Sequence, residues 1–485
     1  MRPKLKFLSS DLIKKIFAEG IDVLENIGVE LNNPELLSLL GDHGARIDVD
    51  KSRAYIPEPL VNKALKSVPN SFALFDTLGQ QTHDFRKYNI HFTPGSAALN
   101  ILDHKTQKIR KPLTEDYIQY TKVISSLENI ASQSTALIPI DVVGNIADSY
   151  RLYLSLMFCD KPVVTGAFTI KAFEIMKDLQ LAVRGTAAAL KEKPLTIFSC
   201  CPTSPLKWSD VTSQNLADCA RFSIPVEFIS MPLSGLVAPV TLTGTLIQHT
   251  AETLSGVVIS QLVNPGTPIL WGGSPAAFDM RYETTPMGAI ETMMIDCACN
   301  EIGKFLNIPT QAYISLSDAK LLDAQAGLES GIGATLASLA GINNISGPGM
   351  LDFESCQSLE KLVLDNEIAG MCLRLVDGIT PREDFPILPL LEELLKEDHL
   401  LISSHTRKYL KQEHYFPGPA IDRANRERWA EEGSLTLGER AHNEVNRMLA
   451  EYKPTSLPDT VKSDLKNRMQ AEAVNNGQEN LPALD

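Results

Sequence analysis

The stretch 341–365, GINNISGPGMLDFESCQSLEKLVLD, contains the strand-to-helix transition from which the fold is best worked out. Residues 342–345 are typical of a short buried strand, and a turn and a loop then lead into an amphipathic helix. Gly347 and Gly349 in the turn have no Cβ and would allow a ligand to approach the backbone. Two carboxylates and an aromatic residue follow the turn: Asp352, Phe353 and Glu354. Barrel enzymes carry their chemistry at such strand ends, although an ordinary connecting turn would show the same pattern.

Apolar strands and amphipathic helices alternate outward from this stretch, over residues 89–378. The predicted strands are 90–93, 131–139, 162–166, 195–201, 225–231, 268–272, 310–314 and 342–345. The predicted helices are 114–127, 147–159, 170–184, 210–222, 242–263, 287–306, 318–340 and 357–376. Eight strand–helix units predict an α/β fold of the (β/α)8 TIM-barrel type. An open doubly wound sheet would alternate similarly, but the chain has no nucleotide-binding fingerprint, and continuous apolar strands such as PVEFISM fit a covered parallel barrel.

Helical segments flank the predicted barrel on both sides. Residues 1–88 are predicted to form an N-terminal helical cap, because 8–27 has helical periodicity and two further helix starts follow at prolines. Residues 104–111 would form a small hairpin within the first unit. Residues 379–485 are predicted to be a C-terminal helical extension with a frayed tail over the last fifteen residues.

Composition excludes several classes of protein. The 485 residues are 44% hydrophobic and 21% charged, as in ordinary globular proteins, and the net charge of −14 argues against a nucleic-acid partner. No apolar run approaches the length of a membrane span, and the first residues lack the pattern of a signal peptide. The eight cysteines lie mostly in apolar segments and are expected to be reduced, which favours a cytoplasmic location.

Three blocks of sequence together resemble the trimethylamine methyltransferase family of corrinoid-dependent enzymes. The first is ENIGVELNNPELLSLLGDHGARID with the following YIPEPLVNKALKSVP, and the second is GPGMLDFESCQSLEKLVLDNEIAGM. The third is HTRKYLKQEHYFPGPAIDRANRERWAEEGSLTLGERAHNEVNRMLAEYKP. The likeness extends over almost the whole chain.

The resemblance implies a TIM-barrel enzyme that moves a methyl group from a methylamine to the Co(I) of a separate corrinoid (cobalamin) protein. Founding members of the family carry pyrrolysine, and this chain has none. Relatives without it include demethylases of glycine betaine, proline betaine, carnitine and γ-butyrobetaine, so a quaternary amine is the expected substrate. The family pattern Asn-Leu-Val-His after the last strand is replaced by a run that ends in Ser346. The shorter serine favours a larger substrate, such as proline betaine, over glycine betaine.

Aromatic rings and carboxylates suit a quaternary ammonium, because the cation has no N–H to donate. The tertiary amine is a good leaving group, so the protein mainly has to hold and aim the methyl group. The predicted substrate-binding residues are Phe92, Trp271, Tyr282, Tyr313, Ser346, Gly347, Gly349, Asp352, Phe353 and Glu354. Aromatic residues also fill barrel interiors, and Glu354 would equally suit the start of the following helix.

A metal of the chain's own is not expected from the sequence. Cys297 and Cys299 are two residues apart and cannot share a helix face, and Cys200–Cys201 has no accompanying CxxC or HxH motif. His249 and Glu252 are more readily explained as a solvent-facing or inter-helix pair. Two other functions stay open: a tertiary-amine or methylated-sulfur demethylase, and a non-catalytic betaine-binding module or corrinoid-protein scaffold. A homo-oligomer is expected.

Overall fold

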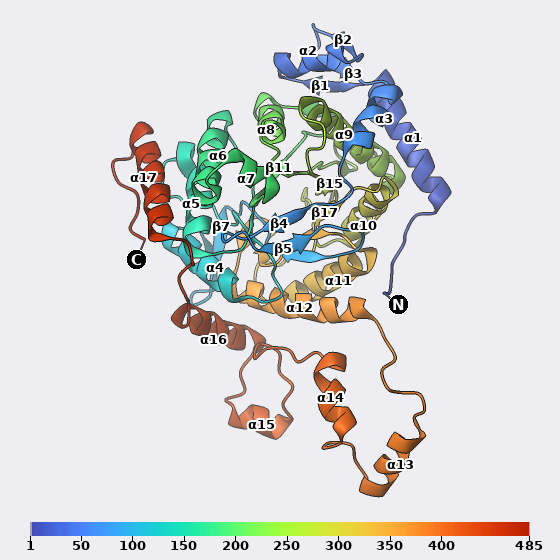
Figure 1. The fold of residues 1–485 in the computed structure, drawn as a ribbon, viewed down its shortest axis with the longest axis vertical. Helices are drawn as coiled ribbons and strands as arrows, with labels where there is room; N and C mark the ends of the chain where they lie inside the picture. The colour runs from blue at the N-terminus through green and yellow to red at the C-terminus, as the bar shows by residue number, and fades with distance from the viewer. Residues whose placement is uncertain (1, 485) are drawn as a thin grey trace.

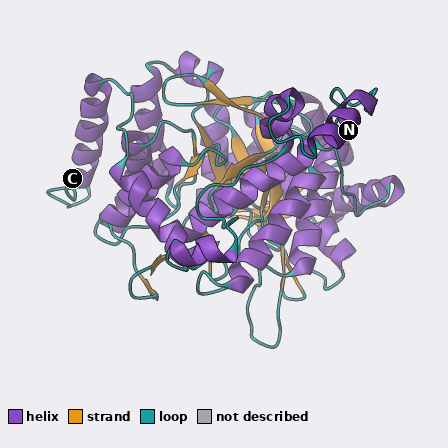
Figure 2. Cartoon of the chain, turned by 90° about the horizontal axis from the view of Figure 1, so that it is seen from below, coloured by secondary structure: helices purple, strands orange, loops and turns teal. Residues whose placement is uncertain are grey.

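The computed structural model describes residues 2–484, and its centre is a parallel barrel of eight strands (Figures 1 and 2). The hydrogen-bonded order is β6-β18-β17-β15-β13-β11-β10-β9. A parallel bridge between Phe92 and Ile130 brings the first strand beside the segment that precedes β9. The strands are β6 (His91–Thr93), β9 (Gln133–Ser134), β10 (Val163–Thr165), β11 (Thr196–Cys200), β13 (Val226–Phe228), β15 (Ile269–Gly273), β17 (Thr310–Tyr313) and β18 (Asn344–Ser346). The prediction of a (β/α)8 barrel is confirmed.

Eight helices follow the strands and surround them, as the purple ring around the orange strands shows in Figure 2. They are α4 (Thr114–Ser126), α5 (Ala147–Phe158), α6 (Ile170–Arg184), α8 (Asp210–Arg221), α9 (Leu242–Val263), α10 (Ile290–Phe305), α11 (Ala324–Ala340) and α12 (Leu359–Asp377). The helix predicted from residue 318 begins only at Ala324. The side chain of Asp323 accepts hydrogen bonds from the backbone N–H groups of Gln325 and Ala326 and so caps the helix there.

A hairpin closes the end of the barrel at which the strands begin. It consists of β4 (Ala73–Phe75) and β5 (Gln81–Asp84). Leu74 and Phe85 pack inside the barrel against Val164, Ile197 and Leu270. Because this end is filled with apolar side chains, a ligand has access only from the opposite end, where the strands finish.

A small sheet at the opposite end supports the loop after β18. Its order is β19 (Met350–Leu351), β20 (Cys356–Gln357), β7 (Asn100–Asp103) and β8 (Lys108–Arg110). Strands β7 and β8 form the hairpin expected over 104–111. The sheet therefore fixes both ends of the segment that contains Asp352, Phe353 and Glu354.

The N-terminal segment contains short strands as well as helices. Its helices are α1 (Ser10–Asn26), α2 (Pro34–Asp42) and α3 (Glu58–Ser67), and α1 and α3 pack on α9. Its strands β1 (Val29–Leu31), β2 (Arg46–Asp48) and β3 (Arg53–Tyr55) join β12 (Lys207–Trp208) in a four-stranded sheet. Three-residue strands are too short to show a period of two, which is why the sequence indicated only helices.

The C-terminal segment begins as an arm that projects from the barrel (Figure 1, bottom). The arm carries α13 (Leu388–Glu397), α14 (Ser404–Glu413) and α15 (Arg426–Glu431), and the chain then returns as α16 (Leu437–Ala450), which packs on α12 and α4. The final helix, α17 (Asp459–Asn475), packs on α5 and α6, with Leu465, Met469 and Ala473 buried. Contrary to the expected frayed tail, this helix continues into the last fifteen residues, where Gln478 accepts a hydrogen bond from the backbone of Val143.

Candidate active site

A cavity of about 250 Å³ lies where the barrel strands end. Its volume is just below the range of small-molecule sites, which starts near about 300 Å³. Residues from several strand ends and loops line it, among them Thr135, Arg151, Phe168, Cys201, Tyr313 and Glu354. The position matches the end of the barrel at which enzymes of this fold carry their chemistry.

Glu354 reaches the cavity because of an unusual turn. Three consecutive residues, Asp352, Phe353 and Glu354, have φ angles of 50°, 54° and 68°. This left-handed region is unfavourable for residues with a side chain and persists only where the surroundings impose it. The carbonyl of Ser355 accepts hydrogen bonds from the N–H groups of Leu99 and Asn100, and the N–H of Asp352 donates to Ala319. The strained turn sends Glu354 inward, while Phe353 lies outside beneath Lys320 Nζ, 3.8 Å from the ring centroid.

Buried carboxyl groups gather at this end of the barrel without a basic partner. The Oε1 atom of Glu354 and both carboxylate oxygens of Asp296 are buried with no hydrogen-bond partner. Glu227 accepts hydrogen bonds from Ser199 Oγ (2.7 Å) and Asn344 Nδ2 (3.2 Å). Over residues 2–484, no lysine or arginine forms an ion pair with any of the three.

Burial raises the pKa of each of these carboxyl groups. The pKa of Glu227 rises to about 7 through burial, even though the hydrogen bonds from Ser199 and Asn344 lower it. The pKa of Glu354 rises well above its usual value, first through burial and then through the charge of Glu227. Burial, followed by the charge of Glu354, has the same effect on the pKa of Asp296. Such a site binds protons or a cation.

Arg151 supplies a buried guanidinium to the same cavity. It donates to Asp148 Oδ1 (2.7 Å) and to the carbonyls of Thr135 (3.0 Å) and Ala147 (3.3 Å). These bonds use three of its five N–H groups, so two remain for an anion in the cavity. Phe168 is 60% exposed and its ring lies 5.3 Å from the Arg151 guanidinium carbon. The cavity thus joins an acidic region and a basic group.

Tyr313 and Glu354 are the predicted residues that line the cavity. The hydroxyl of Tyr313 lies 3.0 Å from Ser96 Oγ. Phe92 and Trp271 lie in the core cluster instead, and the Nε1 of Trp271 donates to the carbonyl of Cys299 on α10. Tyr282 is 75% exposed and lines a separate surface hollow with Phe353. The structure therefore does not bring the expected aromatic residues together as a cage.

The remaining predicted residues have structural roles in the turn. Ser346 is buried, and its Oγ accepts a hydrogen bond from Asn344 Nδ2, which also donates to Glu227. A Cβ on Gly347 would lie 2.3 Å from the carbonyl oxygen of Ile314, and one on Gly349 would lie 2.1 Å from Gln357 Oε1. Both glycines are needed for packing of the protein on itself rather than for ligand approach. Asp352 accepts from Ser355 Oγ and does not line the cavity.

Four residues on which the description of the site rests were not predicted: Glu227, Asp296, Arg151 and Phe168. Glu227 had a visible signal, since it is the single charged residue within the apolar run PVEFISM. Arg151 is the single basic residue of the largely apolar helix ADSYRLYLSLMF. Phe168 lies in a loop and had no such signal.

The motifs set aside as metal sites are structural in this fold. The Nε2 of His249 lies 3.0 Å from the carbonyl oxygen of Gly272. Glu252 is also buried, not solvent-facing, and accepts hydrogen bonds from Ser204, Ser230 and Gln248. Burial raises the pKa of the Cys297 and Cys299 thiols well above the usual value.

Within the described residues, no helix combines the length and apolar character required to cross a bilayer.

The fold and site define a (β/α)8-barrel enzyme with a small cavity at the strand ends, lined by Glu354 and Arg151 among mostly small and apolar residues. The family model for trimethylamine methyltransferase (MTTB) matches residues 1–474, and the chain belongs to this family. It is therefore a methyltransferase.

Individual relatives agree with this assignment. The chain is 30% identical to a glycine betaine methyltransferase of Desulfitobacterium hafniense, over 96% of each chain. It is 28% identical to a trimethylamine methyltransferase MttB of the same species, over 95% of this chain and 92% of the relative. The monomethylamine methyltransferase MtmB of Methanosarcina barkeri has a similar structure, with a TM-score of 0.54 at 12% identity over 98% of this chain and 89% of that one. The last likeness concerns the fold alone.

Proposed function

We propose that this enzyme transfers a methyl group from a quaternary amine with a carboxylate, a betaine, to the Co(I) of a separate corrinoid protein. The observation that carries the proposal is the group of buried carboxyls, Glu354, Glu227 and Asp296, that has no basic partner. A trimethylammonium-type cation would supply the missing positive charge without needing a hydrogen-bond acceptor. The relative that acts on glycine betaine supports the same substrate class.

The two ends of a betaine match the two regions of the cavity. Glu354 and Tyr313 would contact the ammonium group, and the free N–H groups of Arg151 would bind the carboxylate. Trimethylamine has no carboxylate and would leave Arg151 unused. The cavity walls would exclude water and hold one methyl group toward the open end of the barrel.

The chemistry needs no proton donor on the protein. Co(I) of the partner protein, which acts as the second substrate, forms the bond to the methyl carbon, and the C–N bond breaks with its electron pair on nitrogen. The product is a neutral tertiary amine. Because the neutral amine no longer carries the positive charge of the substrate, the buried carboxyls attract it less strongly than the substrate. This weaker attraction promotes release of the product.

The test is a methyl-transfer assay with the reduced cognate corrinoid protein. Conversion of Co(I) to methyl-Co(III) is followed by absorbance with proline betaine, glycine betaine, carnitine and trimethylamine. We expect transfer from betaines. The preference for a larger betaine expected from Ser346 is not part of the proposal, because Ser346 is buried and does not line the cavity. Transfer from trimethylamine alone would favour the tertiary-amine alternative, and tight betaine binding with no transfer would favour a binding module.

Binding of the cation should depend on pH. The carboxyl groups bind protons more readily than usual, and a quaternary ammonium competes with those protons. Affinity should therefore fall as the pH drops below about 7, the pKa of Glu227, by up to about tenfold per pH unit for each carboxyl that must ionise. Calorimetry in buffers of different ionisation enthalpy should show release of a proton on binding. An affinity unchanged between pH 6 and 8, with no proton released, would contradict this linkage.

The homo-oligomer expected from the sequence stays a prediction. The arm is the segment that we propose to meet a second copy, because α13 has no buried residue in the described chain. Its Leu388, Leu391 and Leu395 are exposed.

A further inference from the structure

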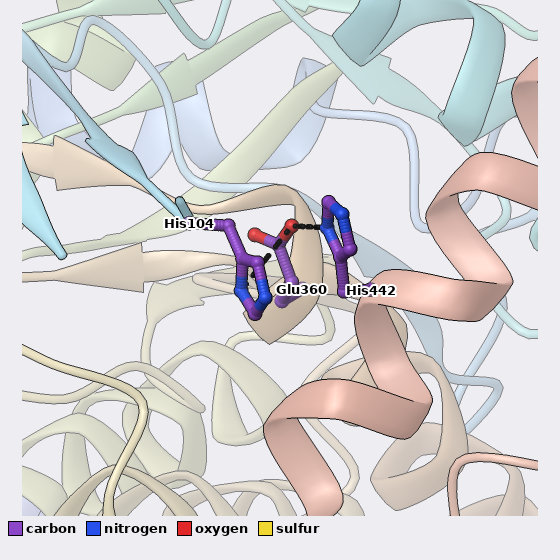
Figure 3. Close-up of side chains that lie close together, drawn as sticks. All are labelled: His104, Glu360 and His442. Atoms are coloured by element: carbon purple, nitrogen blue, oxygen red, sulfur yellow. Dashed lines mark hydrogen bonds and ion pairs between the residues drawn. The ribbon is translucent and has the colours of Figure 1, made fainter. Parts of the chain in front are cut away.

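Two histidines and a glutamate meet outside the cavity, where three distant parts of the chain converge (Figure 3). His104 directly follows β7, Glu360 lies in the first turn of α12, and His442 lies on α16. The ligand atoms of all three lie within 4.8 Å of one another. Figure 3 shows the carboxylate of Glu360 beside the two imidazole rings, with a dashed line to each of them.

The separations between these atoms fit a shared metal ion. Glu360 Oε1 lies 2.9 Å from His442 Nδ1 and 3.8 Å from His104 Nδ1. Ligands bound at about 2.0–2.1 Å in a tetrahedral arrangement are roughly 3.3 Å apart, between these two values. Because the two ring planes are nearly parallel, the imidazoles must turn about their side-chain bonds for all three atoms to bind one ion.

A hydrogen-bonded cluster alone does not account for His104. One N–H of His442 can donate to Glu360, but 3.8 Å is too long for a hydrogen bond from His104. Over residues 2–484, the imidazole of His104 has no hydrogen-bond partner. Its ring stacks on that of His442, with centroids 4.0 Å apart and planes inclined by 8°. The two imidazoles and the carboxylate together offer three ligand atoms to one metal ion.

The surroundings have the features of a metal site. Glu360 is 7% exposed, while each histidine is 25% exposed, so an ion could enter and keep a water ligand. Ser358 Oγ donates to Glu360 Oε2 at 3.3 Å and orients the carboxylate. Two histidines and one glutamate form a ligand set known for zinc, with a fourth position open.

We propose that His104, Glu360 and His442 bind a divalent transition-metal ion of the zinc class. The ion joins the β7–β8 hairpin and α16 to the start of α12. Strand β7 pairs with β20, which follows the turn of Glu354, so the ion also fastens the support of that turn. None of the three ligands lines the cavity, and the role is structural.

The test uses the full chain without an affinity tag, stripped with a chelator and then titrated with Zn²⁺ against a chromophoric competitor. Metal content after gel filtration gives the stoichiometry, and Co²⁺ in place of zinc gives visible absorption bands typical of tetrahedral coordination. We expect one ion per chain. His104→Ala, Glu360→Gln and His442→Ala should each weaken binding by at least about tenfold.

The matched control is His43→Ala, since this exposed histidine follows α2 and its Nδ1 lies 2.8 Å from the carbonyl of Leu39 in that helix. It should leave zinc affinity unchanged. Circular dichroism checks the fold of each variant. If the variant of the buried Glu360 misfolds, His104→Ala still tests the site, because His104 lies in a partly exposed turn and its replacement should not disturb the fold. Absence of zinc binding at micromolar concentration in the wild-type chain, or equal affinity in any folded ligand variant, would overturn the assignment.

Discussion

Replacing Glu354 with glutamine is expected to lower kcat/KM for a betaine by about a hundredfold. The substitution keeps the shape of the side chain and removes its charge. A carboxylate about 4 Å from a cation contributes roughly 4 kcal/mol at an effective dielectric constant of 20. The expected hundredfold loss corresponds to about 3 kcal/mol and lies within this limit, because burial disfavours the ionised form of Glu354. Initial rates of methyl transfer to the reduced corrinoid protein measure the effect.

The matched control is Asp352→Asn, two residues earlier in the same turn. Asparagine tolerates the left-handed conformation of Asp352, whose φ is 50°, and keeps an acceptor for Ser355. Because Asp352 does not line the cavity, its variant should retain activity within about twofold. Equal losses in the two variants would mean that the turn, rather than the charge of Glu354, sets the activity. Thermal unfolding of both proteins would identify a loss caused by misfolding.

Tyr313 lines the cavity, whereas Phe92 and Trp271 face the helices, and the strand register explains why the sequence alone did not separate them. Strand register places Tyr313 beside Ser346 and Ser346 beside Thr93, and the Thr93 side chain bonds Asn344 inside the barrel. Phe92, one residue earlier than Thr93, therefore faces the helices. Trp271 pairs with Thr310, which bonds Asn300 on α10. In a covered parallel strand both faces are apolar, so alternation does not reveal which residues point inward.

The position of Glu354 illustrates a second limit. The alternation of strands and helices was sufficient for the barrel, because eight repeated units all indicate the same architecture. The turn after β18 depends instead on three consecutive residues with positive φ, a conformation that local sequence preferences disfavour. It is imposed by partners far away in sequence, such as Leu99 and Ala319. Contacts of this kind are known only once the fold is known.

A buried ion pair at the base of the same turn gives the largest expected effect on stability. The Oδ2 of Asp365 accepts from Lys361 Nζ (2.6 Å) and from the backbone N–H of Gly349 (2.6 Å), and Lys361 Nζ also donates to Ser330 Oγ. Both charged side chains are completely buried. Asp365→Ala would leave the Lys361 ammonium buried without its counter-ion. The free energy of unfolding should therefore fall by about 3–5 kcal/mol.

The double variant Lys361→Met, Asp365→Leu separates the charge effect from the loss of packing. Apolar replacements of similar volume remove both charges together, so this protein should be clearly more stable than Asp365→Ala alone. It still lacks the acceptor for the Gly349 N–H, and an unsatisfied buried donor costs about 1–3 kcal/mol. Denaturant unfolding followed by tryptophan fluorescence measures both proteins. A loss below about 1 kcal/mol for Asp365→Ala would contradict the prediction, because the lysine would then have found another partner or lost its proton. Since Gly349 begins the segment that carries Glu354, betaine affinity should fall in the double variant even where the barrel stays folded.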